Sequence, residues 1–234
     1  MGGEMTRIRV DVSAAERVLD WRDVHGPARA VLYAVIGAKE PDLARQLHDD
    51  GWAGSSLRPV GVSPPLFMGA GYQHGAYTTS GFGSVWFGSP VPQIAAALLR
   101  ALSDVRELRW GGARLSVRGT ELEWAPSHTS GQADFQTVSP VLVKLESRFL
   151  LPHDNGYVDR LEHNLRHKAD VLGLPNDVAV EVLNAGPRRV FDVAGAKRVG
   201  ANVRLRVTAA PVLLDALYEW GLGLNTVQGF GWVK

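Results

Sequence analysis

The sequence has no cysteine, which excludes disulfide bridges, thiolate zinc sites and thiol nucleophiles, and which fits a reducing compartment. It also lacks a secretory signal, since the opening residues MGGEMTRIRV hold no apolar run. No stretch approaches the run of about 20 apolar residues that a membrane helix needs. These absences predict a cytoplasmic protein that does not bind a membrane.

A large net charge is missing as well. The chain has 25 Lys and Arg residues against 24 Asp and Glu residues, so no overall field indicates a polyanionic partner, and any basic surface must be local. The remaining composition is ordinary for a globular protein, because 45% of the 234 residues are hydrophobic and 21% are charged. The length fits one large domain or two small ones.

Strand and helix patterns alternate along the first half of the chain. Apolar and polar residues alternate in residues 6–14, as in a half-buried strand, and apolar residues recur at helical spacing in residues 25–38. The further elements predicted here are a helix at 41–51, a strand at 59–67 within Gly/Pro/Ser-rich loops, a strand at 76–89, a helix at 92–102, and strand pieces in 107–119.

The second half repeats the same order of elements after SHTSGQ (127–132), the best candidate for a linker. The elements predicted here are a strand at 137–146, a helix at 158–173, two strands in 178–193 around a turn, a strand at 203–209, a helix at 211–221, and a closing strand at 230–234.

Each half therefore reads as β-α-β-β-α-β, with one spare strand in the second half. This order predicts an α+β protein of two tandem ferredoxin-like (RRM-like, βαββαβ) domains, covering residues 1–126 and 127–234. Open sheets of this type bind RNA in RNA-recognition domains, but the fold alone does not fix a function.

The segment GLGLNTVQGFG (221–231) carries four regularly spaced glycines. It has neither the Gly-Lys-Ser/Thr of a phosphate-binding Walker loop nor the spacing of a dinucleotide fingerprint. Glycines without side chains let another backbone or a phosphate approach closely. The pattern alone leaves a structural hairpin and a ligand-facing loop both open.

This glycine-rich ending resembles the C-terminal signature of the RAMP superfamily, in particular the CRISPR-associated endoribonucleases that cut precursor CRISPR RNA within each repeat. Other pieces resemble the same enzymes in order along the chain, namely AVLYAVI, DLARQLHDDG, RPVGVS, PQIAAALLRAL, QTVSPVLV and VAVEVLNAGPRRVFDV. One departure is that the five residues between the glycine pairs are uncharged, where family members often carry a basic residue.

The resemblance implies a fold of two tandem ferredoxin-like domains and a metal-independent cleavage of RNA. In that reaction the 2′-OH attacks the neighbouring phosphate and leaves a 2′,3′-cyclic phosphate and a 5′-OH end. It implies CRISPR repeat RNA as the partner, with further CRISPR effector-complex subunits and a homodimer as possible assemblies. It implies no metal and no cofactor.

The resemblance also points to three catalytic residues. His48 matches the general acid/base histidine of the family, Tyr33 its active-site tyrosine, and Arg58 stands where several members have lysine. Histidine titrates near neutrality, whereas arginine stays charged and can only clamp a phosphate. His25 is a reserve candidate. The pattern alone leaves a helix-end histidine, a packing tyrosine, a solvated arginine and a helix-start histidine as the alternatives.

A local basic stretch offers an RNA-binding surface, because residues 187–206 hold six basic residues against Asp192 alone. A solvated strand edge is the structural alternative. The residues predicted to bind RNA are Arg188, Arg189, Lys197, Arg198 and Arg204 of this stretch, and Gly221, Gly223, Asn225, Gln228, Gly229 and Gly231 of the glycine-rich segment.

Two other functions remain open from the sequence. A non-catalytic RAMP-type scaffold subunit would bind CRISPR RNA without cutting it, and an unrelated double ferredoxin-like protein would bind a small molecule. His48 and Tyr33 favour the endoribonuclease over the scaffold, and retention of repeat RNA on a filter would separate the small-molecule binder from both.

Overall fold

The N-terminal sheet has the ferredoxin-like strand order in the computed structural model, which describes residues 6–73 and 75–234. All its strand pairs are antiparallel, and β1 lies in the middle. The strands, in the order in which they pair, are β3 (Gly61–Val62), β7 (Gly83–Gly88), β1 (Thr6–Ala14), β9 (Ala113–Trp124) and β8 (Glu107–Trp110), and β4 (Leu66–Phe67) also pairs with β7.

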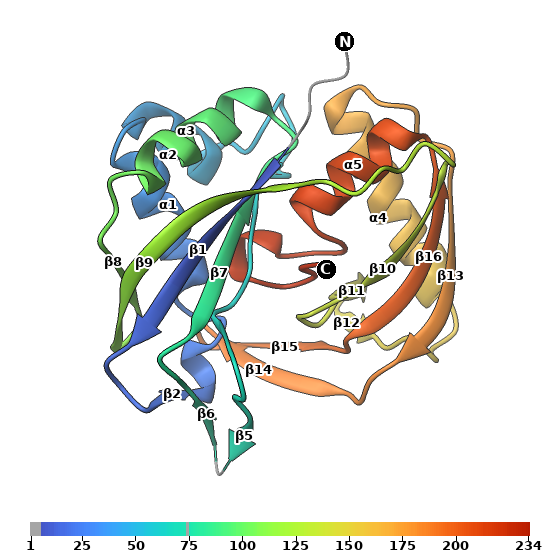
Figure 1. Ribbon diagram of the computed structural model, residues 1–234. Helices are drawn as coiled ribbons and strands as arrows, with labels where there is room; N and C mark the ends of the chain where they lie inside the picture. Colours follow the sequence, from blue (N-terminus) through green and yellow to red (C-terminus); the bar gives the residue numbers. More distant parts are fainter. Residues whose placement is uncertain (1–5, 74) are drawn as a thin grey trace.

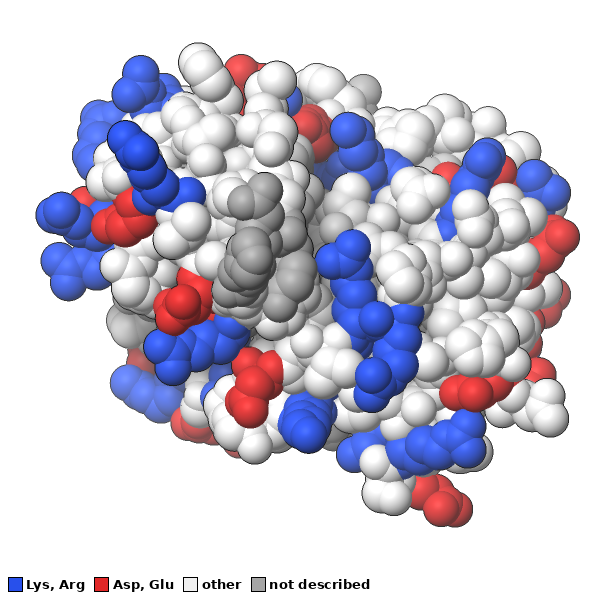
Figure 2. Space-filling model, turned by 90° about the horizontal axis from the view of Figure 1, so that it is seen from below, with Lys and Arg blue, Asp and Glu red and all other residues white. Residues whose placement is uncertain are grey.

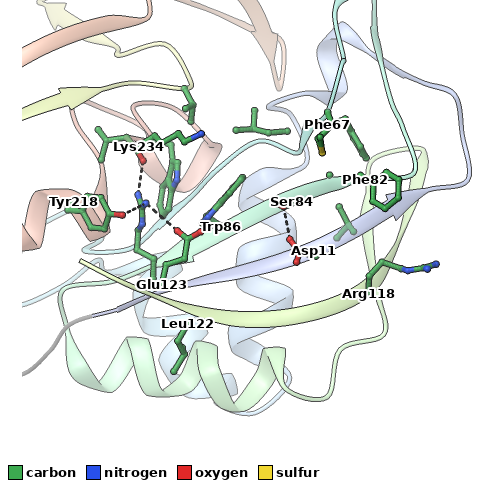
Figure 3. A pocket seen from close by; sticks show the side chains of 18 of the residues that line it. Asp11, Phe67, Phe82, Ser84, Trp86, Arg118, Leu122, Glu123, Tyr218 and Lys234 are labelled. Atoms are coloured by element: carbon green, nitrogen blue, oxygen red, sulfur yellow. Dashed lines mark hydrogen bonds and ion pairs between the residues drawn. The ribbon is translucent and has the colours of Figure 1, made fainter. Parts of the chain in front are cut away.

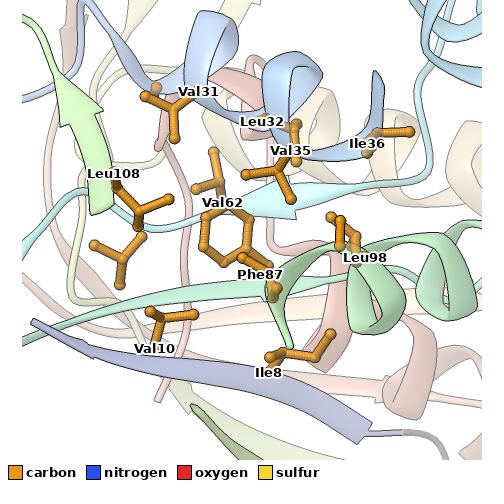
Figure 4. Close-up of a cluster of buried hydrophobic side chains, with 14 of the residues drawn as sticks. Ile8, Val10, Val31, Leu32, Val35, Ile36, Val62, Phe87, Leu98 and Leu108 are labelled. Atoms are coloured by element: carbon orange, nitrogen blue, oxygen red, sulfur yellow. The ribbon is translucent and has the colours of Figure 1, made fainter. Parts of the chain in front are cut away.

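Three helices cover one face of this sheet, as Figure 1 shows: α1 (Ala28–Gly37), α2 (Pro41–Asp49) and α3 (Pro92–Leu102). The alternation along β1 turns Ile8 and Val10 toward the helices, where they pack with Leu32 and Leu98 in one buried cluster (Figure 4). The other face of the sheet is left free for the C-terminal half. The bounds predicted for the helix at 92–102 are those of α3.

The C-terminal sheet repeats this order. Its strands are β10 (Gln132–Gln136), β16 (Val203–Ala209) and β13 (Val178–Ala185), and its helices are α4 (Tyr157–Leu172) and α5 (Pro211–Trp220). The last residues supply the fourth strand position, because Thr137 pairs with Val233 and the Lys234 amide donates to Gln136 O at 2.8 Å.

Short strands and single helical turns complete the chain. The hairpin of β14 and β15 extends under both sheets in Figure 1 and meets the short helix η1. These elements are β2 (Val18–Asp20), η1 (Trp21–Asp23), β5 (Tyr72–Gln73), β6 (Ala76–Thr78), β11 (Val143–Leu145), β12 (Arg148–Leu150), β14 (Arg189–Val193), β15 (Ala196–Gly200) and η2 (Thr226–Gln228).

The predicted fold class of two tandem ferredoxin-like units is confirmed, but one strand was misplaced. The segment 137–146 was predicted as the first strand of the second half, whereas β10 ends at Gln136 and only Val143–Leu145 of that segment is a strand. Pro140 lacks the amide hydrogen that a central strand needs. The domain division after residue 126 stays a prediction, and His128 of the predicted linker is buried and bonded to Asp215 at 2.7 Å.

The glycine-rich segment 221–231 enters the space between the two sheets, where the C-terminus lies in Figure 1. Its four glycines are all buried, and all four have positive φ. A Cβ on Gly231 would lie 1.8 Å from the carbonyl oxygen of Leu222, so only glycine fits there. Thr226 donates to Val60 O at 3.1 Å and ties the segment to the N-terminal half.

A buried arginine joins the first strand to the C-terminal half. Arg7 is 3% exposed and donates to Val233 O at 2.6 Å and to the Tyr218 hydroxyl at 2.5 Å. Its guanidinium also lies 3.6 Å from the centre of the Tyr218 ring. Removing a partner of a buried cation strongly destabilises the folded protein. Arg7 therefore holds the two halves in contact. Within the described residues, no helix has the length and apolarity needed to cross a membrane.

We expect Gly231→Ala to unfold the protein at a much lower temperature than Gly156→Ala. Both glycines have positive φ, but a Cβ on Gly156 meets nothing within 4 Å. Gly156→Ala should cost roughly 1 kcal/mol for the left-handed backbone, whereas Gly231→Ala adds a backbone clash and should cost about 4 kcal/mol or more. Thermal unfolding followed by circular dichroism measures both, and equal losses would contradict the close approach.

Candidate active site and RNA-binding surface

Three side chains from separate elements meet on the surface of the N-terminal half. Tyr33 lies on α1, His48 lies in the last turn of α2, and Arg58 precedes β3. The rings of Tyr33 and His48 are 5.2 Å apart and nearly perpendicular, and the Arg58 guanidinium donates to the His48 carbonyl at 2.6 Å. These are the three residues predicted to be catalytic, and the structure brings them together.

The imidazole of His48 is held in one orientation while remaining accessible. Its Nδ1 lies 2.7 Å from a carboxylate oxygen of Asp49, and its side chain is 53% exposed. A carboxylate only accepts hydrogen bonds, so Nδ1 carries the proton of this bond. The opposite nitrogen, Nε2, is then free to exchange a proton with a ligand, as in other oriented histidines.

Arg58 is fixed by the backbone around it. It donates to Ser56 O at 2.7 Å as well as to His48 O, and it is half-buried. A guanidinium has five N–H donors in a rigid plane, so donors remain for a phosphate beside His48. Arg58 supplies charge to this site but no proton transfer.

Tyr33 is held protonated. Its hydroxyl donates to Leu47 O at 3.3 Å, and partial burial of the phenol raises the pKa of Tyr33 above its ordinary value. The nearby charges of Arg58 and Arg29 offset part of this rise in pKa. The phenol therefore serves as a neutral hydrogen-bond donor at neutral pH rather than as a base.

Two further residues of this site were not assigned to it from the sequence. Asp49 orients the imidazole, and Arg29 lies one helical turn before Tyr33, close enough to affect its pKa. The adjacency of Asp49 to His48 in the chain and the i, i+4 spacing of Arg29 and Tyr33 are signals from which both could have been found.

His25, the reserve candidate, lies in different surroundings. It is 1% exposed, and its ring stacks on Phe230 with 4.0 Å between centroids. Burial lowers the pKa of His25 to about 3, so it is neutral at physiological pH. It contacts Gln228 and Phe191 rather than the three clustered residues.

The segment 221–231 presents little surface to a ligand. The four glycines predicted to bind RNA, Gly221, Gly223, Gly229 and Gly231, are buried, and so is Gln228. Asn225 alone of the predicted residues is partly exposed, and it adopts the left-handed conformation that starts η2. The contacts of the loop are structural, because its amides and carbonyls pair with Leu142, Pro140 and His25.

The predicted basic residues differ in their availability. Arg188, Arg189 and Lys197 are exposed, and none of them makes an ion pair within the described part of the chain. Arg198 is half-buried on β15. Arg204 is paired with Asp134 at 3.1 Å, which neutralises part of its charge. Figure 2, seen from the side of β14 and β15, shows a stripe of basic side chains right of centre without acidic ones between them.

A wide cleft of about 1130 Å³ lies between the two sheets. Figure 3 shows Glu123 and Tyr218 at one end of it and Phe67 and Phe82 toward the other. Arg7, Arg118 and Lys234 line the cleft together with Asp11 and Glu123, so its walls carry charges of both signs. Within residues 6–73 and 75–234, no three His, Asp or Glu side chains are grouped to hold a metal ion.

Comparison with known proteins points to one family. Residues 123–234 match the family model described as CRISPR associated protein Cas6, C-terminal. A Pyrococcus furiosus protein named CRISPR-associated endoribonuclease Cas6 is 27% identical over 218 residues, covering 88% of this chain and 80% of that protein.

Solved structures share the fold along nearly the whole chain. One, reported as the characterization of a Cas6-related gene from Pyrococcus furiosus, has a TM-score of 0.82 at 19% identity, with 98% of each chain covered. Another, reported as an RAMP protein binding different RNA substrates, has a TM-score of 0.81 at 21% identity, also with 98% of each chain covered. At such identities the likeness establishes the fold.

We expect Arg58→Gln to raise the pKa of Tyr33 further. A positive charge favours the phenolate, so removing it makes the phenol harder to ionise. Titration of ¹³Cζ-labelled tyrosine by NMR measures the change, and Tyr33→Phe assigns the signal. Arg45→Gln is the control, since Arg45 lies on α2 but pairs with Asp42. A Tyr33 titration that is the same in Arg58→Gln and in the control would contradict the contact.

Proposed function

We propose that this protein is an endoribonuclease that cuts precursor CRISPR RNA within the repeat, because its residues 123–234 match the Cas6 C-terminal family model and it is similar to a protein named as a Cas6 endoribonuclease. The cleavage is metal-independent and proceeds by attack of the 2′-OH on the adjacent phosphate. The products are guide RNAs with a 2′,3′-cyclic phosphate and a 5′-OH end. The protein acts as a soluble RNA-processing enzyme of the cytoplasm.

The observation that carries this proposal is the convergence of Tyr33, His48 and Arg58 at one exposed site. Intramolecular RNA cleavage needs a group that moves a proton near neutrality and a cation that stabilises the extra phosphate charge. The site offers one of each, plus a neutral phenol. The relative from Pyrococcus furiosus, which carries the name endoribonuclease, supports the same reaction.

The side chains divide the work. Nε2 of His48 takes the proton of the 2′-OH as the oxygen bonds to phosphorus, and the imidazolium returns a proton to the 5′ oxygen as the P–O bond breaks. Asp49 holds the imidazole with Nε2 outward and stabilises the charged ring. Arg58 binds the non-bridging phosphate oxygens. The single proton of the Tyr33 hydroxyl turns from the Leu47 carbonyl to the phosphate when RNA binds.

We assign the RNA-binding surface to the exposed basic side chains that make no ion pair among the described residues. Arg188, Arg189 and Lys197 on and beside the β14–β15 hairpin contact the phosphates, and Arg198 and Arg204 contribute less because the first is half-buried and the second is paired. The glycine-rich segment contributes indirectly, because it holds the two sheets against each other. Asn225 remains the one residue of this segment that we assign to RNA contact.

We expect the wild-type protein to cut repeat RNA in EDTA and His48→Ala to cut it about 10²- to 10⁴-fold more slowly, as is typical for loss of an acid/base group. Denaturing gel electrophoresis of end-labelled RNA measures the single-turnover rate. His163→Ala is the control, because His163 is an exposed histidine of α4. Full activity in His48→Ala would remove His48 from the mechanism.

The same assay separates the alternatives. A 2′-deoxy nucleotide 5′ of the cut should abolish cleavage without abolishing binding, because it removes the nucleophile. Loss of wild-type cutting in EDTA would contradict the metal-free mechanism. Tight binding of repeat RNA without cutting under any condition would instead identify a scaffold subunit.

We expect replacement of Arg188, Arg189 and Lys197 together by Gln to make the negative slope of log K against log salt shallower by about 2 to 3, since each lost phosphate contact removes about 0.7 to 0.9. Fluorescence anisotropy of labelled repeat RNA between low and moderate salt measures the slope. The control replaces Arg100, Arg106 and Arg109, which lie around the end of α3 and on β8. Equal slopes in both variants would show that the hairpin does not contact RNA.

A further inference from the structure

A small pocket lies where the N-terminal and C-terminal halves meet beside the β14–β15 hairpin. It has a volume of about 230 Å³ and is distinct from the wide cleft between the sheets. Its walls include Pro64 and Tyr77 from the N-terminal half and Phe191 and Asn202 from the C-terminal half. The walls are thus flat apolar surfaces with an amide among them. We call it the His25 pocket.

His25 offers the pocket an unused acceptor. Its Nδ1 lies 3.1 Å from the carbonyl oxygen of Gln228, which only accepts, so Nδ1 carries the proton. Burial keeps the ring neutral, with its pKa lowered to about 3. Nε2 therefore keeps its lone pair, and it has no hydrogen-bond partner within the described residues. Phe230 stacked on the ring and Phe191 against its edge fix this orientation.

Arg189 lies at the same pocket with a free charge. It lines the pocket and is exposed, and its guanidinium makes no ion pair within residues 6–73 and 75–234. Arg188 is its neighbour in the chain, and Lys197 lies on the paired strand β15. These three residues place exposed positive charge beside the pocket, so a group that enters it can leave its phosphate next to them.

These features select one ligand chemistry. Flat walls fit a planar ring, an unused imidazole acceptor fits a ring N–H donor, and a free guanidinium fits a phosphate joined to that ring. We propose that the His25 pocket binds one unpaired nucleobase of the RNA, with a base N–H donated to His25 Nε2 and its phosphate held by Arg189. This inference rests on the proposed function, and it adds a subsite for a single nucleotide to it.

The pocket lies close enough to the candidate active site to set where the RNA is cut. Tyr33 is eight residues beyond His25, and α1 begins three residues after His25, so their backbone separation is on the order of 10 Å. A base held in the pocket therefore fixes the register of the strand within a few nucleotides of His48. This role is that of a specificity-determining site, and His25 takes no part in proton transfer.

The test combines a substitution that fills the pocket with a set of RNAs that each lack one base. Ala70 lines the pocket and is partly exposed, so Ala70→Phe fills the pocket without removing a side-chain hydrogen bond. Single abasic sites are placed at each position of the repeat RNA, and binding is measured by fluorescence anisotropy. We expect one position at which the abasic site weakens wild-type binding roughly tenfold, as for loss of one stacked base.

In Ala70→Phe, intact RNA should bind about tenfold more weakly, and the abasic site at that position should cause no further loss. Ala96→Phe, on the exposed side of α3, is the matched control and should keep the wild-type pattern. Arg189→Gln is a second variant that leaves the apolar walls intact, and it should reduce the same abasic effect. Thermal unfolding shows which variants fold.

The outcomes distinguish the two proposals. If the wild type cuts the RNA but the effect of every abasic site is the same in Ala70→Phe and Arg189→Gln as in the wild type, the base pocket is overturned and the proposed nuclease activity is retained. A coupled position without any cutting would support the pocket and overturn the nuclease. Binding of free nucleoside monophosphates that is lost in Ala70→Phe, without a coupled position in RNA, would overturn the assignment to an RNA nucleotide.

Discussion

The structure depends on the close approach of two backbones at the junction of its halves. Edge strand β3 and its neighbour β7 each present a glycine to the end of α5, and a Cβ on Gly61 or Gly88 would lie about 2.5 Å from the carbonyl oxygens of Trp220 and Glu219. Side chains at these positions would separate the sheets. The pocket at His25 and the Arg7 contacts lie at this same junction between the halves.

The junction also buries ionisable groups, and burial shifts their pKa values. Burial lowers the pKa of Lys168 to about 7 and raises the pKa of Glu219 to about 8, each opposite to the shift an ion pair would cause. Lys168 donates to Gly221 O at 2.7 Å and lies 4.4 Å from the Trp220 ring. The start of the glycine-rich segment is thus held by a lysine of α4, whereas Thr226 and Gln228 farther along it contact the N-terminal half.

Much of the fold was predictable because apolar residues recur with a clear strand or helix period in elements that pack on one face only. The strand at 203–209 and the helix at 92–102 were predicted with their observed bounds. Resemblance located Tyr33, His48 and Arg58, whereas their convergence depends on how α1 packs on α2, which no local pattern encodes. The burial of Gly229 against His25 and the pairing of Arg204 with Asp134 join residues far apart in the chain, so their sequence neighbourhoods gave no sign of them.

The bond from Arg7 to the carbonyl of Val233 spans 226 residues of sequence. A nascent chain leaves the ribosome at about 5–20 residues per second, so the first strand waits roughly 10 to 45 s for this acceptor to be synthesised. During that interval the guanidinium and the uncovered face of the N-terminal sheet stay in contact with solvent or with chaperones. Closure of the two halves therefore comes late in folding, after the residues around Val233 have been synthesised.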